Sequence, residues 1–220
     1  MTFQLTEPIL LIGLGGVGAS LAEKAKKSLN SDCLLISHDQ KDLTAENSIK
    51  ISTKSVVNPS THLIRGSTLE TSDEIKKNIA NYSTVILMSN LAGKAGVGIG
   101  PIVSRICKQE QKNLLSFAIM PFKFEKERIF QSGIALKRIR QDSQCTIVVD
   151  NDALLDSNPD LTQKQCYDIS NKAIESMMHS LKSSEISEDT NILSTGKATD
   201  DIEDSLKDSL RMLYEDAPPS

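Results

Sequence analysis

The placement of glycine is the feature of this sequence that most restricts its fold. Eight of the eleven glycines fall in two short segments, 13–18 and 93–100, and each segment directly follows an apolar run. Pro8–Ile12 precedes the first segment and Ser83–Ser89 precedes the second. A glycine turn between a buried strand and an amphipathic helix is typical of α/β proteins whose backbone approaches a ligand closely. We therefore expect two units, each made of a strand, a glycine loop and a helix.

Apolar runs and helical periodicity alternate along most of the chain. The two glycine loops lead into helices predicted at 19–29 and 101–111. Further strands are expected at 33–37, 114–119 and 145–149, and further helices at 72–81, 129–140 and 162–182. This alternation predicts an α/β fold, a Rossmann-like parallel sheet with helices on both faces.

Composition excludes several classes of function. The 25 basic and 29 acidic residues give a net charge of −4, and with no Trp and 4% aromatic residues the chain does not resemble a nucleic-acid-binding protein. Its apolar runs are far shorter than the roughly 18 residues that a membrane-spanning helix needs. No secretion signal is recognisable, so we expect a cytoplasmic protein. The four cysteines form no Cys-x-x-Cys pair, which favours reduced thiols over a metal or redox site.

The first glycine segment by itself fits the dinucleotide fingerprint, Gly-x-Gly-x-x-Gly from Gly13 to Gly18. Asp39, at the end of the second predicted strand, is then placed to accept a hydrogen bond from a ribose hydroxyl. One hypothesis is therefore a Rossmann-type enzyme that uses NAD(P) or ATP. It leaves the segment 93–100 unexplained, although the same sheet presents that segment at its carboxyl edge. Two phosphate cradles on one edge indicate a nucleotide held from both sides.

Together, the two glycine segments and the motif Met120-Pro-Phe-Lys-Phe-Glu125 resemble the FtsZ/tubulin family of GTP-binding cytoskeletal proteins, over about Ile9–Leu181. Residues 37–39 resemble the Asn-Thr-Asp loop of that family, and 151–155 resemble its Asn-Asp-x-Leu-Leu motif. The resemblance implies GTP or GDP as ligand, Mg²⁺ as a possible companion ion, and a role in the prokaryotic cytoskeleton or cell division. The positions it assigns to the nucleotide are Gly15, Gly16, Val17, Gly18, Ser20, Asp39, Gly93, Lys94, Ala95, Gly96, Val97, Gly98, Glu125, Arg128, Asn151 and Asp168.

Four of these side chains carry specific roles under the resemblance. The Asp168 carboxylate would accept from the N1 and N2 hydrogens of guanine and repel adenine, while Asn151 would donate to the guanine carbonyl or N3. Glu125 and Arg128 would hold the ribose. Each of these residues also fits a purely structural role. Asp39 fits a turn cap, and Glu125 with Arg128 fits an ion pair at the surface. Asp168 fits a solvated helix face, and the glycines fit tight packing.

The chain also departs from the family pattern. The glycine-rich third loop is reduced to the glycine of Arg65-Gly-Ser67, and two threonines of the second glycine segment are replaced by Ala95 and Val97. Lys94 replaces a glycine, and its ammonium either faces the phosphates or points to solvent. The aligned stretch 188–193, Glu-Asp-Thr-Asn-Ile-Leu, lacks the Asn-x-Asp-x-x-Asp order of the loop that the family uses for hydrolysis. We therefore expect little or no hydrolysis, and a nucleotide-free scaffold is a second alternative.

The composition changes near the end of the chain. From Glu185 onward there are ten acidic residues against three basic ones, and Ile202, Leu206, Leu210 and Leu213 form one apolar helical stripe. We expect a nucleotide-binding domain over 1–182, followed by an acidic linker and C-terminal helix over 183–220 that resemble a truncated second domain. The expected partners are a guanine nucleotide and either another copy of the chain or a full-length FtsZ-like homologue.

Overall fold

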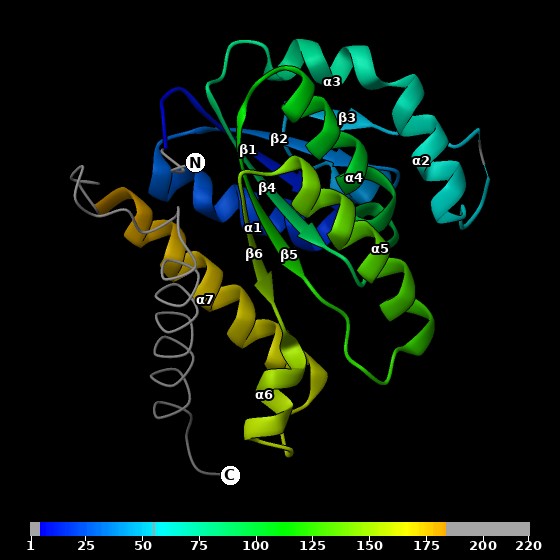
Figure 1. The fold of residues 1–220 in the computed structure, drawn as a ribbon, viewed down its shortest axis with the longest axis vertical. Helices are drawn as coiled ribbons and strands as arrows, with labels where there is room; N and C mark the ends of the chain where they lie inside the picture. The colour runs from blue at the N-terminus through cyan, green and yellow to red at the C-terminus, as the bar shows by residue number, and fades with distance from the viewer. Residues whose placement is uncertain (1–4, 55, 184–220) are drawn as a thin grey trace.

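The computed structural model describes residues 5–54 and 56–183, and these form one parallel sheet covered by helices (Figure 1). The sheet has six strands in the order β3-β2-β1-β4-β5-β6, and every neighbouring pair is parallel. The α/β expectation is thereby confirmed. The strands are β1 (Ile9–Leu14), β2 (Asp32–Ser37), β3 (Ser48–Lys50), β4 (Thr84–Asn90), β5 (Asn113–Ile119) and β6 (Cys145–Val149).

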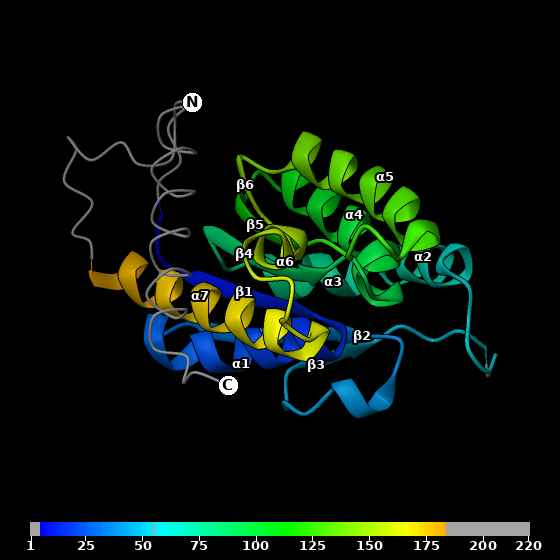
Figure 2. The same cartoon turned by 90° about the horizontal axis from the view of Figure 1, so that it is seen from below.

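Helices cover both faces of the sheet, as Figure 2 shows edge-on. They are α1 (Gly15–Leu29), the short 3-10 helix η1 (Gln40–Asp42), α2 (Thr61–Glu70), α3 (Ser72–Ile79), α4 (Lys94–Gln109), α5 (Lys126–Asp142), α6 (Asn151–Ser157) and α7 (Gln163–Ser183). Strand side chains alternate between the layers, so Leu10 and Ile12 pack with α4 while Leu11 packs with α1 and α7. Two apolar layers therefore bury the central strands completely.

The two glycine segments are helical at their carboxyl ends, which corrects the predicted helix starts. α1 begins at Gly15 rather than Ala19, and α4 begins at Lys94 rather than Pro101. Low helix propensity argued for loops at these positions. The glycines are instead part of the helix, where close packing leaves no room for a side chain. A Cβ at Gly96 would overlap the carbonyl oxygen of Asn90, and a Cβ at Gly98 would lie 2.8 Å from the Ile64 side chain.

The structure contains elements that the sequence patterns did not predict, namely β3, α2 and α6. Helix α2 begins after Ser60, whose hydroxyl accepts a hydrogen bond from the backbone N–H of Leu63. It includes the segment Arg65-Gly-Ser67, where the resemblance placed the remnant of a glycine-rich loop. In this chain that segment is a helix packed on α4 through Ile64.

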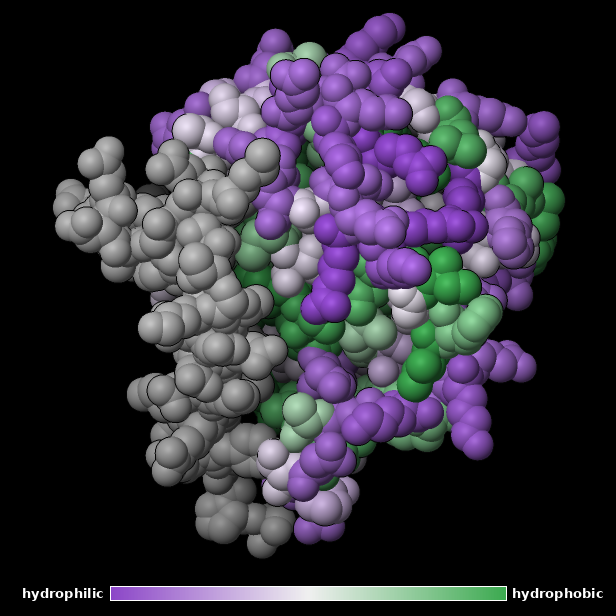
Figure 3. All heavy atoms as spheres, viewed as in Figure 1, coloured by the Kyte–Doolittle hydropathy of each residue, from purple (hydrophilic) through white to green (hydrophobic). Residues whose placement is uncertain are grey.

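Strand β6 closes one edge of the sheet, and three of its five residues are only partly buried. Figure 3 shows the face of the molecule that is turned to the viewer in Figure 1. This face is mostly hydrophilic, with apolar side chains visible between the polar ones. None of the helices among the described residues has the length and hydropathy to span a membrane. The predicted C-terminal helix, and all of 183–220 except Ser183, lie outside the described residues.

Candidate functional site

The order of the strands creates a crevice at the carboxyl edge of the sheet. Strands β1 and β4 are neighbours, with Leu14 paired to Ser89 at their carboxyl ends. The chain then leaves β1 into α1 on one face and leaves β4 into α4 on the opposite face. In open α/β sheets, ligands bind where successive connections diverge in this way.

The first turns of α1 and α4 face each other across this crevice. Neither N-cap residue, Leu14 for α1 or Gly93 for α4, caps its helix with a side chain. Gly15 has a φ of +65°, and a Cβ there would lie 2.9 Å from the Ala95 Cβ, so the two helix starts touch. Their leading N–H groups have no partner within the helix and carry partial positive charge. This arrangement can hold an anion such as a phosphate. We call it the α1–α4 cradle, formed by residues 15–18 and 93–98.

The predicted cradle residues differ in exposure. Gly16 and Ser20 are exposed and Val17 is half-buried, whereas Gly18 packs so closely that a Cβ would overlap the carbonyl oxygen of Met88. Ala95, Gly96, Val97 and Gly98 are all buried. Close packing therefore explains why glycine occupies positions 18, 96 and 98. Gly15 and Gly16 bring the start of α1 to the crevice.

Asp39 and Lys94, two charged residues predicted at the nucleotide site, have partners within the protein. Asp39 caps η1 by accepting from the backbone N–H of Lys41, and it forms a 3.1 Å ion pair with the Lys41 ammonium. Hydrogen bonds to Lys41 lower the pKa of Asp39. The Lys94 ammonium donates to Asn58 Oδ1 at 2.6 Å and to the carbonyl of Pro59 at 2.9 Å. Lys94 therefore ties the start of α4 to the loop before α2.

Two residues near the cradle, Asp42 and His38, have no role in the predictions made from the sequence. A Cβ at Gly16 would lie 2.9 Å from Asp42 Oδ1, and the other carboxylate oxygen accepts from the Ser37 hydroxyl at 2.7 Å. His38 has a buried Nδ1 without a hydrogen-bond partner, and its burial lowers its pKa below the ordinary 6.5. Their position directly after the second apolar strand could have marked them as candidate site residues. The sequence pattern there instead favoured Asp39 as the residue that contacts a ligand.

A cavity of about 330 Å³ opens between the start of α4 and the start of α5. It brings together four predicted residues from two segments, namely Gly93, Lys94 and Val97 at the start of α4 and Arg128 in α5. Glu125 does not line this cavity. Its carboxylate pairs with the Arg128 guanidinium at 2.6 Å and accepts from the backbone N–H of Phe122.

The residues predicted to face the base lie at the same edge of the sheet, on the elements that follow β6. Asn151, the first residue of α6, is fully buried. Its amide donates to the carbonyl of Met120 at 3.2 Å, and its Oδ1 accepts from the Ser170 hydroxyl at 2.6 Å. Asp168 lies exposed near the start of α7, and no hydrogen bond or ion pair within the described part of the chain involves its carboxylate. Asn151 thus links α7 to the residue that directly follows β5, and Asp168 is the side chain open to a ligand.

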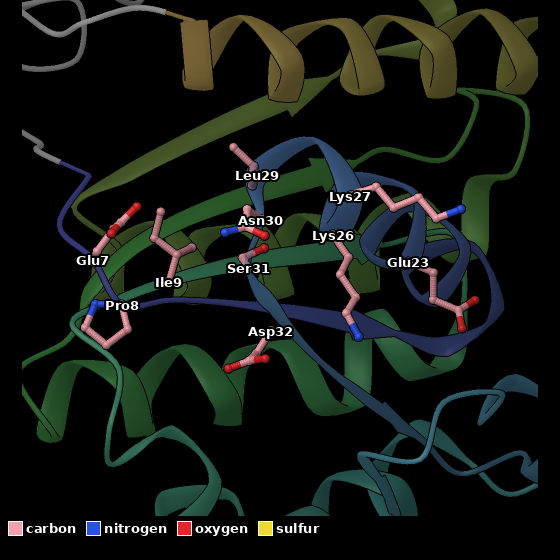
Figure 4. Close-up of a pocket in the computed structure, with 10 residues that line it drawn as sticks. All are labelled: Glu7, Pro8, Ile9, Glu23, Lys26, Lys27, Leu29, Asn30, Ser31 and Asp32. Atoms are coloured by element: carbon pink, nitrogen blue, oxygen red, sulfur yellow. The ribbon is translucent and has the colours of Figure 1, made fainter.

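A second cavity, of about 610 Å³, lies at the opposite edge of the sheet (Figure 4). It is lined by the amino ends of β1 and β2 and by the end of α1, with Glu23, Lys26 and Asp32 among its charged residues. None of the residues predicted to bind a ligand lines it. No group of three His, Cys, Asp or Glu side chains within the described ranges could hold a metal ion.

The six-stranded parallel sheet and the two helix starts at its carboxyl edge are typical of the doubly wound class of α/β domains. The profile of the Tubulin/FtsZ family, GTPase domain, matches residues 8–159, and this chain belongs to that family.

Known relatives agree with this assignment. Cell division protein FtsZ 2 of Halobacterium salinarum is 25% identical over 180 residues, covering 76% of this chain and 44% of the relative. FtsZ of Aquifex aeolicus is 29% identical over 101 residues, covering 45% of this chain and 28% of the relative. The chain thus spans less than half the length of these curated relatives.

Solved structures share the fold. The empty FtsZ dimer of M. jannaschii superimposes with a TM-score of 0.72 at 21% identity, covering 81% of this chain and 55% of that one. CetZ of Methanosaeta thermophila gives a TM-score of 0.66 at 17% identity, covering 84% and 56%. At these identities the similarity establishes the fold.

Proposed function

We propose that this chain binds GTP or GDP with its phosphates in the α1–α4 cradle. The observation that carries the proposal is the contact between two helix starts that lack side-chain caps, at the topological switch point of a Tubulin/FtsZ-family domain. Backbone N–H groups of Gly15–Val17 and of Lys94–Gly96 are the proposed phosphate donors. Arg128, in the cavity beside Gly93, is the proposed contact to the ribose.

Asp168 is the proposed determinant of guanine selectivity. Its carboxylate is exposed, and a carboxylate accepts from both the N1 and N2 hydrogens of guanine, whereas it repels the acceptor N1 of adenine. Asn151 is engaged by Met120 and Ser170, so it acts in this proposal by positioning α7. The Rossmann-type NAD(P) hypothesis has no comparable use for the second helix start or for Arg128.

We propose that hydrolysis is weak or absent in the isolated chain. The third glycine-rich loop is replaced by α2, and the sequence offers no acidic loop of the family type in 188–193. A phosphate-release assay on the purified chain should stay near the background rate. Sustained turnover would contradict this part of the proposal.

A role in the cytoskeleton or in cell division follows from the family, and we propose a homologous partner. The proposed partner is a second copy of the chain or a full-length FtsZ-like protein, because the relatives it resembles are cell division proteins of the FtsZ type. Sedimentation with a full-length FtsZ-like homologue, in GTP and in GDP, tests this. Absence of co-sedimentation in both would argue against it.

Thermal unfolding with GTP, GDP, ATP and NADH, with and without Mg²⁺, tests the central proposal. A ligand at about 100 times its Kd stabilises the folded state by about 2.7 kcal/mol, which for a chain of this size raises Tm by roughly 5–11 °C. We expect that shift with guanine nucleotides only. Asp168→Asn should abolish the preference over ATP, while Asp160→Asn, an exposed residue before α7, should not. No shift with any ligand would favour the nucleotide-free scaffold, and a shift with NADH or ATP alone would favour the Rossmann-type enzyme.

A further inference from the structure

The exposed large apolar side chains in the described part of the chain gather on two helices. All of them lie on α2, on α5 or in the segment that leads into one of these helices, namely Val56, Val57, Leu69, Phe124, Phe130 and Ile134. Phe130 is 72% exposed and Leu69 is 53% exposed. Apolar side chains that are exposed together, rather than scattered singly, mark a surface that contacts another segment or molecule.

Helices α2 and α5 lie on the same face of the sheet, on either side of α4 (Figure 2). Ile64 of α2 and Ile139 of α5 both pack against glycines of α4. At the start of α2, the Thr61 hydroxyl donates to the side-chain oxygen of Gln131 in α5 at 3.4 Å. The outer surfaces of the two helices are therefore neighbours.

Each of these helices carries side chains spaced by four residues, which lie on one side of a helix. On α5 they are Phe130, Ile134 and Arg138, and on α2 they are Arg65 and Leu69. Each helix thus presents apolar groups next to a guanidinium. We call these five residues the α2–α5 face.

The two guanidinium groups of this face lack acidic partners. The buried Nε of Arg65 has no hydrogen-bond partner, and neither Arg65 nor Arg138 forms an ion pair with a described residue. Burial lowers the pKa of Arg65, and the like charge of Arg138 lowers it further, so the two groups are close enough to repel each other. Helix α5 as a whole has five basic residues against two acidic ones. The face therefore attracts negative charge.

The C-terminal part of this chain has the matching chemistry. The segment 200–216 lies outside the described residues, and it contains seven acidic residues against two basic ones. Its apolar residues recur at helical spacing and predict one stripe, formed by Ile202, Leu206, Leu210 and Leu213. The sequence therefore predicts an acidic amphipathic helix, which complements a basic surface with exposed apolar groups.

The connecting segment is long enough for this helix to reach the α2–α5 face. Between Ser183, the last described residue, and Ile202 there are 18 residues, which extend to roughly 60 Å at most. A compact domain of about 180 residues has a radius of gyration of only roughly 16 Å. Reach thus allows any face of the domain, and charge and apolar character select this one.

We propose that residues 200–216 dock on the α2–α5 face of the same chain, with the apolar stripe against the apolar residues of the face and the acidic side chains beside its two guanidinium groups. An amphipathic helix laid against an apolar surface is a common mode of recognition, and complementary charge suppresses wrong pairings. The docked segment covers the apolar groups that the described residues leave exposed. This docking does not depend on a bound nucleotide.

Tryptophan fluorescence of the full chain tests the proposal, because the sequence contains no Trp. Leu210→Trp introduces an indole into the apolar stripe, and Leu213→Trp gives a second reporter should the first disturb docking. In each, the indole should be shielded from acrylamide, and its emission should be blue-shifted relative to the chain unfolded in urea. This shielding should be the same at all protein concentrations.

Two variants of the face should expose the indole. Phe130→Asp removes a large apolar contact, and the loss of one such buried side chain lowers a docking equilibrium by roughly tenfold or more. Arg138→Glu reverses a charge of the face and keeps the fold, because the new carboxylate lies beside Arg65. Lys27→Glu makes the same charge change at an exposed position of α1, on the opposite face of the sheet, and should leave the indole shielded.

The other outcomes contradict the proposal. An indole that is open to acrylamide with both reporters would show that the segment does not dock. An indole that stays shielded in both Phe130→Asp and Arg138→Glu would place the segment on another surface. Shielding that increases with protein concentration would assign the segment to a second copy of the chain and overturn docking within one chain.

Discussion

Replacement of Gly66 by alanine tests whether the segment 65–67 is a regular helix. Gly66 is exposed in the middle of α2, and a Cβ there would meet nothing within 4 Å. Alanine is favoured over glycine inside a helix by about 0.8–1.0 kcal/mol, mainly because glycine loses more backbone entropy. For a chain of 150–250 residues, Tm should rise by about 2–4 °C. A loop that approaches a ligand would not gain from this change.

The assay is thermal and urea unfolding, with two glycine variants for comparison. Gly133→Ala in α5, where a Cβ is also unobstructed, should raise Tm by a similar amount. Gly96→Ala should lower it markedly, because the Cβ would overlap the carbonyl oxygen of Asn90. A fall in Tm for Gly66→Ala together with a rise for Gly133→Ala would refute the helical assignment of 65–67, and with it the argument that α2 replaces the glycine-rich loop.

Three further predictions concern single side chains. Lys94→Ala should speed proteolysis of the loop before α2, because the substitution removes the hydrogen bonds to Asn58 and Pro59. It should change the affinity for GDP by less than about twofold. A large loss of affinity would instead place the Lys94 ammonium on the phosphates. His38 has a lower pKa in the folded chain than its ordinary 6.5, so the unfolded chain binds the extra proton and the free energy of unfolding should fall as pH drops below about 6.5. His38→Asn should flatten that dependence in urea titrations, and an unchanged slope would contradict it. Burial raises the pKa of Cys33 to about 11 and that of Cys107 to about 12. Neither thiol should therefore react with Ellman's reagent at about pH 8 until urea unfolds the chain. Rapid labelling of either cysteine in the native protein would contradict their burial.

The sequence predicted the sheet well because its strands are continuous apolar runs, which parallel strands buried on both faces require. Cys145–Val149 was predicted with the bounds that the structure has. Helix starts were misplaced because glycine propensity was weighed without the packing partners, such as Asn90 behind Gly96. Helix α2 was missed because its stability comes from Ile64 packed on α4, a contact that no local pattern reveals.

The site was predictable where it depends on backbone position and less so where it depends on side-chain partners. The convergence of Gly15 with Ala95 follows from two glycine segments at one sheet edge. The engagement of Asn151 by Ser170, and of Lys94 by Asn58, joins residues far apart in the sequence. Spacing along the chain carries no information about such pairs. The roles assigned to Asp168 and Arg128 stay predictions until a ligand is measured.

The parallel pairing of β1 with β4 has a consequence for folding kinetics. Ile9 pairs with Thr84, so the two strands meet only after every element between them, from α1 to α3, has been enclosed in one long loop. Closing such a loop is entropically costly and slow relative to local helix formation. The α1–α4 cradle does not exist before that step. If the proposed nucleotide binds there, it binds too late to guide early folding, and its effect should be a slower rate of unfolding.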